Sequence, residues 1–408
     1  MSGGERSGDE LSGGGLRYLS IEDVDVLAGL GDPVPGDLAD ALRGMRLADH
    51  HVHGCYTAEI DRAQFEESIN EGSPDPIPAF MTQFDSQLGF AIRRWCSPLL
   101  GLQPHASADD YWARRASLPR REVNRAMLTP AGASRWYLDT GFKGGSISSA
   151  AEMTEDSGVP GSEILRLEVL AEGLLNDGVS PAEYPEAFRS ALQDEDHVVG
   201  YKTIAAYRTG FDIDWSRPSD AEVVRAVQAW ATATDGPARL LDPRLIAFGI
   251  HEAADLRRPV QFHVGFGDRD MDLHRSNPMY LLDLLRQPAI AGTPVMLLHC
   301  YPYHREAGYL SQAFDDVYFD VGLTLNYLGT QSRQIVAESL ESGPFAKQLF
   351  SSDAFGLSEL HVLGSILWRR SMAQVLSTWV REGDWSEADA IRVARMIGRD
   401  NAERVYGI

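Results

Sequence analysis

A His-x-His pair, His51 and His53, ends a short apolar segment near the start of the sequence. Side chains alternate between the two faces of a strand, so both imidazoles would point to the same side and could bind one ion. Neutral imidazole is a common ligand of Zn²⁺ and related divalent cations. The pair alone is weak support for a metal site, because polar edge strands also contain such pairs.

Three further residues with ligand chemistry, His263, His299 and Asp353, each stand at the end of a separate apolar segment. Imidazoles combined with a carboxylate are typical of a catalytic site that leaves one position open for water. Histidines at three segment ends favour a shared ion over individually hydrogen-bonded core residues. The predicted ligands are His51, His53, His263 and Asp353. For His299 we expect either a further ligand or an acid beside the ion.

Lys202 also ends an apolar segment, where a charged ammonium is costly unless it is paired or loses its charge. Carbamylation by CO₂ would convert it into a carboxylate that bridges two metals. Alternatively, Lys202 pairs with Asp353, Glu168 or a substrate carboxylate. Both interpretations stay open, so we predict one or two divalent ions. Zn²⁺ is preferred, with Mn²⁺ or Fe²⁺ as alternatives.

Two of these residues are predicted to take part in the reaction itself. Asp353 would accept a proton from the attacking water and return it to the leaving nitrogen. Its alternative role is ligation alone. His299 would polarise the scissile carbonyl if it is not itself a ligand.

Four residues are candidates for substrate binding. Arg208 offers a guanidinium fork that suits a carboxylate, and Tyr207 lies beside it in the sequence. Arg166 and Glu168 end another apolar segment and would either hold an amino-acid head group or form a buried ion pair.

Eight short apolar segments position these residues, and helical patterns separate most of them. They span residues 45–53, 136–139, 164–168, 198–202, 260–263, 295–299, 317–320 and 349–353. Continuous apolar runs are typical of parallel strands buried on both faces. Each run ends in a polar residue, as strands do at the catalytic mouth of a barrel. We therefore predict an α/β fold, a distorted (β/α)₈ TIM barrel.

The rest of the chain fits one large domain. We expect residues 1–15, rich in Gly, Ser and acids, to form a disordered tail. Residues 16–408 then form a single barrel domain. A helical insertion occupies about residues 60–130, after the first strand, where aromatic residues and arginines are frequent.

Composition excludes several classes of partner. The 408 residues include 37 Lys and Arg against 59 Asp and Glu, a net charge of −22, which disfavours nucleic acid. Three widely spaced cysteines indicate a reducing compartment, and no apolar run approaches the roughly 20 residues that span a bilayer. We expect a cytoplasmic protein with a small-molecule substrate and no membrane partner; a homo-oligomer is compatible with the composition.

The order of these residues resembles a known superfamily. Asp49-x-His51-x-His53 followed by Lys202, His263, His299 and Asp353 resembles the metal-dependent amidohydrolases, over about residues 45–408. Residues 200–210, 299–309 and 351–356 resemble more narrowly the nodulin/FluG-type, amidohydrolase-2 branch, whose domain is in some organisms fused to a glutamine synthetase-like domain. The resemblance implies a distorted barrel with one or two divalent ions. Members mostly hydrolyse C–N, C–O or P–O bonds, and some decarboxylate or isomerise.

Our leading hypothesis is a metal-dependent hydrolase that cleaves the C–N (amide) bond of a small amino-acid-derived substrate such as a γ-glutamyl amide. A zinc-dependent non-oxidative decarboxylase of a small carboxylic acid could use the same ligands. A catalytically inactive barrel with a binding role is a third hypothesis, and the presence of every candidate ligand argues against it.

Overall fold

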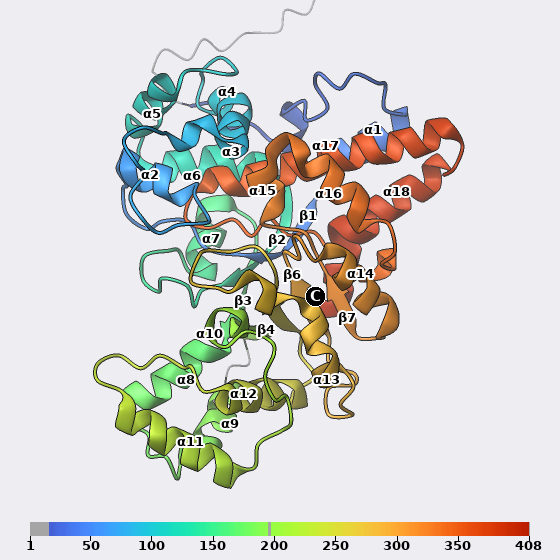
Figure 1. Cartoon of the computed structure of the whole chain (residues 1–408). Helices are drawn as coiled ribbons and strands as arrows, with labels where there is room; N and C mark the ends of the chain where they lie inside the picture. The colour runs from blue at the N-terminus through green and yellow to red at the C-terminus, as the bar shows by residue number, and fades with distance from the viewer. Residues whose placement is uncertain (1–15, 195–196, 408) are drawn as a thin grey trace, which may run out of the picture.

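The computed structural model of the chain describes residues 16–194 and 197–407 (Figure 1). The predicted disordered tail lies outside the described residues. At the centre is a curled sheet in which each parallel strand pairs with the next one along the chain. Its strands are β1 (Leu47–Val52), β2 (Ala133–Asp139), β3 (Gly161–Arg166), β4 (Val198–Thr203), β5 (Val260–His263), β6 (Val295–Leu298) and β7 (Val317–Phe319).

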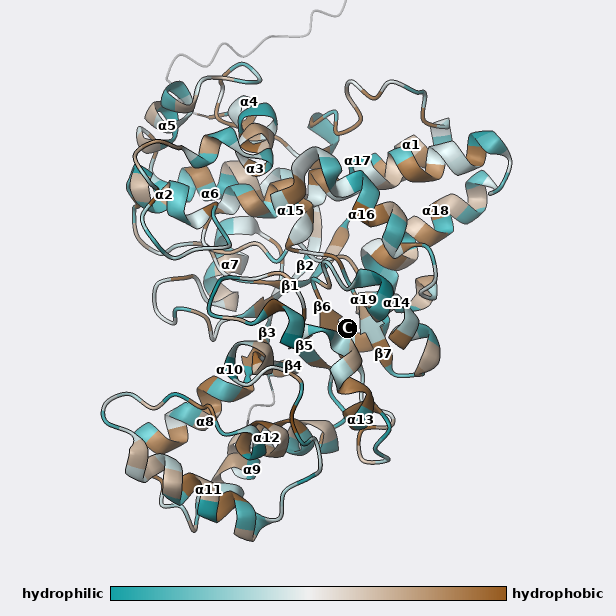
Figure 2. Ribbon diagram, viewed as in Figure 1, coloured by the Kyte–Doolittle hydropathy of each residue, from teal (hydrophilic) through white to brown (hydrophobic). Residues whose placement is uncertain are grey.

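Burial explains why these runs are continuously apolar. Every residue of β1, β5 and β6 is buried, as expected of parallel strands covered on both faces. The surrounding helices carry hydrophobic and hydrophilic residues together, which is the pattern of amphipathic helices with one face on a core (Figure 2). The predicted α/β fold with a barrel-type parallel sheet is confirmed.

We predicted an eighth strand over residues 349–353, but in the structure this segment is not a regular strand. The segment nevertheless lies between β7 and β1 and bonds to both. Leu349 N donates to Phe319 O at 3.0 Å, and Phe350 O accepts from His50 N at 3.1 Å. Asp353 then adopts a left-handed φ of 48°, which an extended strand does not allow. The gap in the barrel is thus closed by irregular chain.

Helices follow most strands and form the outer layer. They are α7 (Ala150–Ser157), α8 (Leu167–Asn176), α9 (Tyr184–Asp194), α10 (Ala205–Arg208), α11 (Asp220–Ala233), α12 (Pro243–Asp255), α13 (Leu282–Leu285), α14 (His304–Ala313), α15 (Thr324–Leu328) and α16 (Ser332–Ser339). Several begin at local sequence signals. Ser149 with Glu152 and Ser219 with Glu222 form capping boxes at the starts of α7 and α11.

Helices also fill the chain between β1 and β2. They are α2 (Arg62–Ser68), α3 (Gln87–Ala91), α4 (Ser97–Leu99), α5 (Ala108–Ala116) and α6 (Arg120–Leu128), with a π-helical turn at Ile92–Cys96. Phe65, Phe84 and Tyr111 form an aromatic cluster among them, with ring centroids 5.5 to 6.1 Å apart. In Figure 1 this group lies on the opposite side of the strands from α8, α9, α11 and α12.

The remaining helices come before β1 and after the irregular eighth segment. They are α1 (Gly36–Gly44), α17 (Ser358–Glu382), α18 (Glu387–Arg395) and α19 (Asn401–Tyr406), with a second π-helical turn at Met396–Asp400. Short 3₁₀ turns occur at Ile21–Asp23, Gln83–Asp85, Thr129–Ala131, Leu273–Ser276, Pro278–Leu281, Gly329–Gln331 and Phe345–Lys347. Among the described residues, no helix combines the length and hydropathy needed to cross a bilayer.

Arg369 of α17 ties this helix to the start of the sheet. Its guanidinium is fully buried and donates to Leu42 O and Met45 O, both at 2.6 Å, and to Ser365 Oγ at 3.1 Å. Burial lowers the pKa of Arg369 to about 9, because no carboxylate contacts the guanidinium among the described residues. The charge is therefore stabilised by main-chain carbonyls at the point where the chain enters β1.

We predict that Arg369→Met lowers the free energy of unfolding by about 2 to 5 kcal/mol, because two buried carbonyls lose a charged donor. Urea unfolding measures the change. Arg392→Met is the control: its side chain is 61% exposed and pairs with Asp389, so the change should stay within about 0.5 kcal/mol. Equal effects of the two substitutions would contradict the structural role of Arg369.

Candidate metal centre

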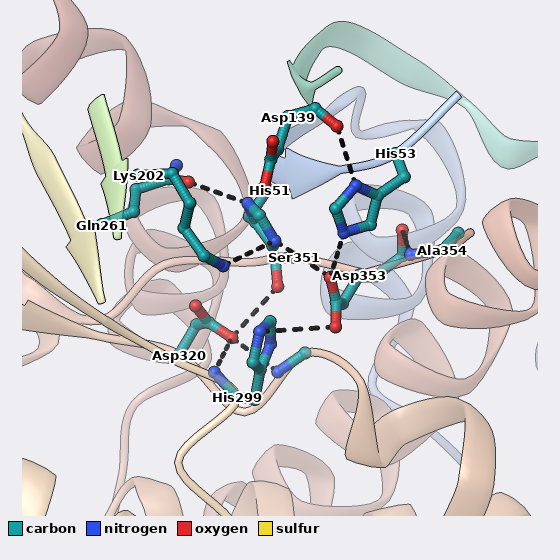
Figure 3. Close-up of polar contacts among 12 residues, drawn as sticks. His51, His53, Asp139, Lys202, Gln261, His299, Asp320, Ser351, Asp353 and Ala354 are labelled. Atoms are coloured by element: carbon teal, nitrogen blue, oxygen red, sulfur yellow. Dashed lines mark hydrogen bonds and ion pairs between the residues drawn. The ribbon is translucent and has the colours of Figure 1, made fainter. Parts of the chain in front are cut away.

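Asp353 lies where three histidine side chains converge at the mouth of the barrel (Figure 3). Asp353 Oδ1 is 3.0 Å from His51 Nε2 and 3.5 Å from His53 Nε2. Asp353 Oδ2 is 3.4 Å from His299 Nε2. The structure therefore brings together residues from β1, from the chain after β6 and from the irregular eighth segment.

His51 in β1 and His53 just after it have fixed orientations. His51 Nδ1 lies 2.8 Å from the side-chain oxygen of Gln261, and His53 Nδ1 lies 2.8 Å from the main-chain oxygen of Asp139. An oxygen acceptor places the proton on Nδ1, which leaves the lone pair on Nε2. Each Nε2 faces Asp353, so both rings present a lone pair to the same region, as metal-binding histidines do.

Burial keeps these imidazoles uncharged. Desolvation lowers the pKa of His53 to about 4, and it lowers the pKa values of His51, His263 and His299 well below the ordinary value. Desolvation acts in the opposite direction on Asp353, whose pKa is raised. A cation would favour the ionised carboxylate without requiring any histidine to lose a proton.

Unpartnered polar atoms show that the donor set fits a metal ion. His263 Nε2, His299 Nε2 and Asp353 Oδ1 are buried without a hydrogen-bond partner in the described part of the chain. Unsatisfied buried polar atoms are costly, and a cation bound beside His51 would satisfy those of His299 and Asp353. The ligand atoms of His51, His299 and Asp353 lie within 4.8 Å of one another. These residue types suit Zn²⁺ and similar ions.

A second group, His51, His53 and Asp139, is equally compact but less suited to a metal. Both carboxylate oxygens of Asp139 are already bonded: Oδ2 accepts from Arg166 Nη2 at 2.6 Å, and Oδ1 accepts from Gly141 N at 3.0 Å. The group around Asp353 is therefore the better candidate for a metal site.

The backbone is strained at two of the convergent residues. His299 has φ 67° and Asp353 has φ 48°, in the left-handed region that side chains with a Cβ rarely adopt. Such strain gathers at functional sites, where the surrounding structure holds it. Asp320 Oδ1 contributes by accepting from His299 N at 3.0 Å.

The remaining predicted ligands lie close by. The ring of His263 packs between those of Tyr207 and His299, at centroid distances of 4.7 and 4.8 Å. Lys202 Nζ is 3.2 Å from His51 Nε2. Burial lowers the pKa of Lys202 to about 8, with Asp139 and Asp353 opposing that shift. Carbamylation of Lys202 requires the neutral amine, and the lowered pKa favours that form, so carbamylation stays a proposal.

The predicted substrate-binding residues divide into two groups. Tyr207 contacts His263, and Arg166 reaches the site through Asp139. Arg208 lies in α10 and donates to Glu172 at 3.0 Å rather than reaching the convergent histidines.

An ion pair between Arg166 and Glu168 was one expectation, and the structure corrects it: Arg166 pairs with Asp139. Glu168 lies in the first turn of α8, not at the end of β3, and accepts from Thr203 Oγ1 at 2.6 Å and Ile204 N at 3.0 Å. The third strand ends at Arg166, so the chain has already turned into a helix at Glu168.

Sequence reasoning missed two residues that act beside these ligands. Gln261 is the one polar residue before His263 in β5, and the spacing of two places both side chains on one face. That alternation could have revealed it. Glu71 comes from the insertion. Its pKa is raised to about 8, mainly by burial and also by the charge of Asp268. No local signal marks Glu71.

Comparison with known proteins identifies the family. The amidohydrolase family model matches residues 177–408, more than half of the chain. The chain belongs to the amidohydrolase family. The resemblance inferred from the sequence is thereby confirmed.

One curated relative of this amidohydrolase is protein fluG of Emericella nidulans, 29% identical over 278 residues. The match covers 60% of this chain and 32% of fluG, so the chain spans about a third of that relative.

Three solved structures share the fold. A protein from Lactobacillus casei described as a metal-dependent hydrolase has a TM-score of 0.78 at 24% identity, covering 89% of this chain and 95% of its own. A uronate isomerase from Bacillus halodurans has a TM-score of 0.62 at 14% identity, covering 91% and 95%. A glucuronate isomerase from Caulobacter crescentus has a TM-score of 0.57 at 13% identity, covering 93% and 97%.

We predict that Arg166→Leu lowers the free energy of unfolding by about 3 to 5 kcal/mol at pH 7, because buried Asp139 is left unpaired. Burial alone would raise the pKa of Asp139, but Arg166 helps to lower it from 3.8 to about 2. In the native protein Asp139 therefore stabilises the fold above pH 3.8, and this contribution is lost as the pH falls through about 2.

Without Arg166, burial raises the pKa of Asp139, and protonation relieves the unpaired charge. The difference in unfolding free energy between the native protein and the variant should therefore narrow between pH 7 and pH 5, as measured by urea unfolding. The double variant Arg166→Leu with Asp139→Asn is the control and should show no narrowing. If the difference in unfolding free energy between the native protein and Arg166→Leu does not change with pH, the stabilising role of the Arg166–Asp139 ion pair is contradicted.

Proposed function

We propose that this amidohydrolase cleaves the C–N bond of a small amino-acid-derived amide, such as a γ-glutamyl amide, with a divalent cation, preferably Zn²⁺. The observation that carries the proposal is the convergence of His51, His53 and His299 on Asp353. Those residues, with His263 beside them, would hold the ion. When bound, the ion supplies a Lewis acid that polarises a carbonyl and lowers the pKa of water.

Asp353 is suited to proton transfer in this reaction. It is buried but still 8% exposed, and its two carboxylate oxygens face different histidines. One oxygen can therefore remain directed at His51 while the other takes a proton from water and delivers it to the leaving nitrogen. Lys202, whose charge lowers the pKa of Asp353 against the effect of burial, favours the ionised form that accepts the proton.

Acidic groups on the insertion side favour a substrate that carries an ammonium group. Glu71 lies near Asp268, and both it and Asp353 interact electrostatically with Tyr207. Burial and the charge of Asp268 raise the pKa of Glu71 even though Tyr327 and Lys143 act in the opposite direction, so the ionised carboxylate is costly there. A substrate ammonium would offset that cost.

We predict that the purified protein binds about one to two equivalents of a divalent metal and hydrolyses γ-glutamyl amides only when metal is present. Release of amine is measured after treatment with a chelator and again after addition of Zn²⁺, Mn²⁺ or Fe²⁺. Parallel assays with amino-acid amides and aromatic carboxylic acids distinguish hydrolysis from decarboxylation. Full activity in the metal-free protein would contradict the proposal, as would CO₂ release without amide cleavage.

We predict that Asp353→Asn lowers kcat by at least about 10²-fold, because the amide cannot accept the proton of water. Metal content is measured on the same sample, so that a lost proton acceptor is separated from a lost ligand. Asp389→Asn, in an exposed turn of α18, serves as the control and should keep the native kcat. A native kcat in Asp353→Asn would remove Asp353 from the mechanism.

A further inference from the structure

Tyr406 of α19 inserts its side chain into the interior of the barrel, beneath the convergent histidines. It is 8% exposed and packs in a buried apolar cluster with Ala48, Ile164 and Met296. Its hydroxyl makes polar contacts inside this apolar layer, where a hydroxyl is costly unless it is hydrogen-bonded. The contacts lead in two directions, and both reach residues of the candidate metal centre.

The first direction runs through Gln261 to His51. Gln261 Nε2 donates to the Tyr406 hydroxyl and to His50 O, both at 2.8 Å. These two acceptors fix the amide so that its oxygen faces His51 Nδ1 at 2.8 Å. That oxygen places the proton of His51 on Nδ1 and leaves Nε2 free. Tyr406 therefore helps to set which nitrogen of His51 carries the lone pair.

The second direction runs through His50 and Asp320 to the backbone of His299. The Tyr406 oxygen already accepts from an amide that can only donate, so its own proton is available to His50 Nδ1 at 3.3 Å. His50 Nε2 then faces Asp320 Oδ2 at 2.9 Å. The other oxygen of Asp320 accepts from His299 N at 3.0 Å and from Ser351 Oγ at 3.0 Å. Figure 3 shows Asp320 between Ser351 and His299.

We propose that Tyr406 is a positioning residue for the metal centre, because its hydroxyl joins the hydrogen bonds that orient the ring of His51 and the strained backbone of His299. The inference rests on the metal binding of the proposed function. It adds that metal affinity depends on a side chain that touches neither the metal ligands nor the substrate. The hydroxyl oxygen of Tyr406 accepts from Gln261, and its proton is donated to His50, so phenylalanine at this position would lose both hydrogen bonds.

The chain offers a matched control in Tyr137. Its ring lies against that of Tyr406 at a centroid distance of 4.3 Å, and both side chains are buried. The Tyr137 hydroxyl has no hydrogen-bond partner among the described residues. Tyr406→Phe and Tyr137→Phe thus remove the same atom from the same layer, and only the first breaks the hydrogen bonds to Gln261 and His50.

The test measures the Zn²⁺ affinity of the metal-free proteins by competition with a chromophoric chelator, alongside their urea midpoints. We expect Tyr406→Phe to weaken Zn²⁺ binding about tenfold and Tyr137→Phe to change it less than about twofold. Tyr406→Phe with native affinity but a lowered midpoint would overturn the inference and leave Tyr406 a structural residue. If the native protein binds no metal, the proposed function fails instead.

A double-mutant cycle tests the route through Gln261. Gln261→Met keeps the length of the side chain and removes the amide, and we expect it to weaken Zn²⁺ binding at least as much as Tyr406→Phe. Adding Tyr406→Phe to Gln261→Met should then weaken binding by much less than the tenfold of the single variant. Independent, multiplicative losses would overturn the route through Gln261. If Tyr406→Phe does not fold, native affinity in Gln261→Met overturns the same step.

Discussion

The site depends on burying uncharged imidazoles around one carboxylate. His51, His53 and His299 approach Asp353 within 3.0 to 3.5 Å, and desolvation keeps their rings neutral while it makes the carboxylate costly to ionise. A divalent cation resolves both effects, because it binds neutral nitrogen lone pairs and attracts the carboxylate. The rest of the fold serves to hold these groups in place before the cation arrives.

Much of that support comes from buried polar groups beneath the site. The backbone N–H and the hydroxyl of Ser352 both donate to the Asp49 carboxylate, at 2.9 Å and 2.5 Å. These two hydrogen bonds fix β1 to the segment that carries Asp353. Burial raises the pKa of Asp49 to about 7, and the hydrogen bonds from Ser352 oppose that shift. Asp320 has a similar role below His299. An irregular eighth segment is tolerated because these bonds replace the regular ladder of a strand.

The loops around the mouth include part of the insertion. Arg269, in the loop after β5, donates to Asp75 of the insertion at 2.8 Å, so two segments distant in sequence meet beside the site. Glu71 and Asp268 come from these same two segments. The charged residues near the mouth therefore come from the insertion and from the loop after β5, whereas the candidate metal ligands belong to the barrel.

The sequence by itself determined the chemistry of the donors and the class of fold. Strand alternation places His51 and His53 on one side, and apolar runs ending in polar residues mark the mouth of a barrel; both are local patterns that survive without knowledge of packing. Only the tertiary structure decided which residues form the hydrogen bonds and ion pairs around the site. Arg166 meets Asp139 rather than Glu168. Gln261 contacts His51, and Tyr406 contacts Gln261, although both come from segments far along the chain. The physical reason is that a hydrogen bond between distant segments depends on how strands and helices pack, which no local pattern encodes.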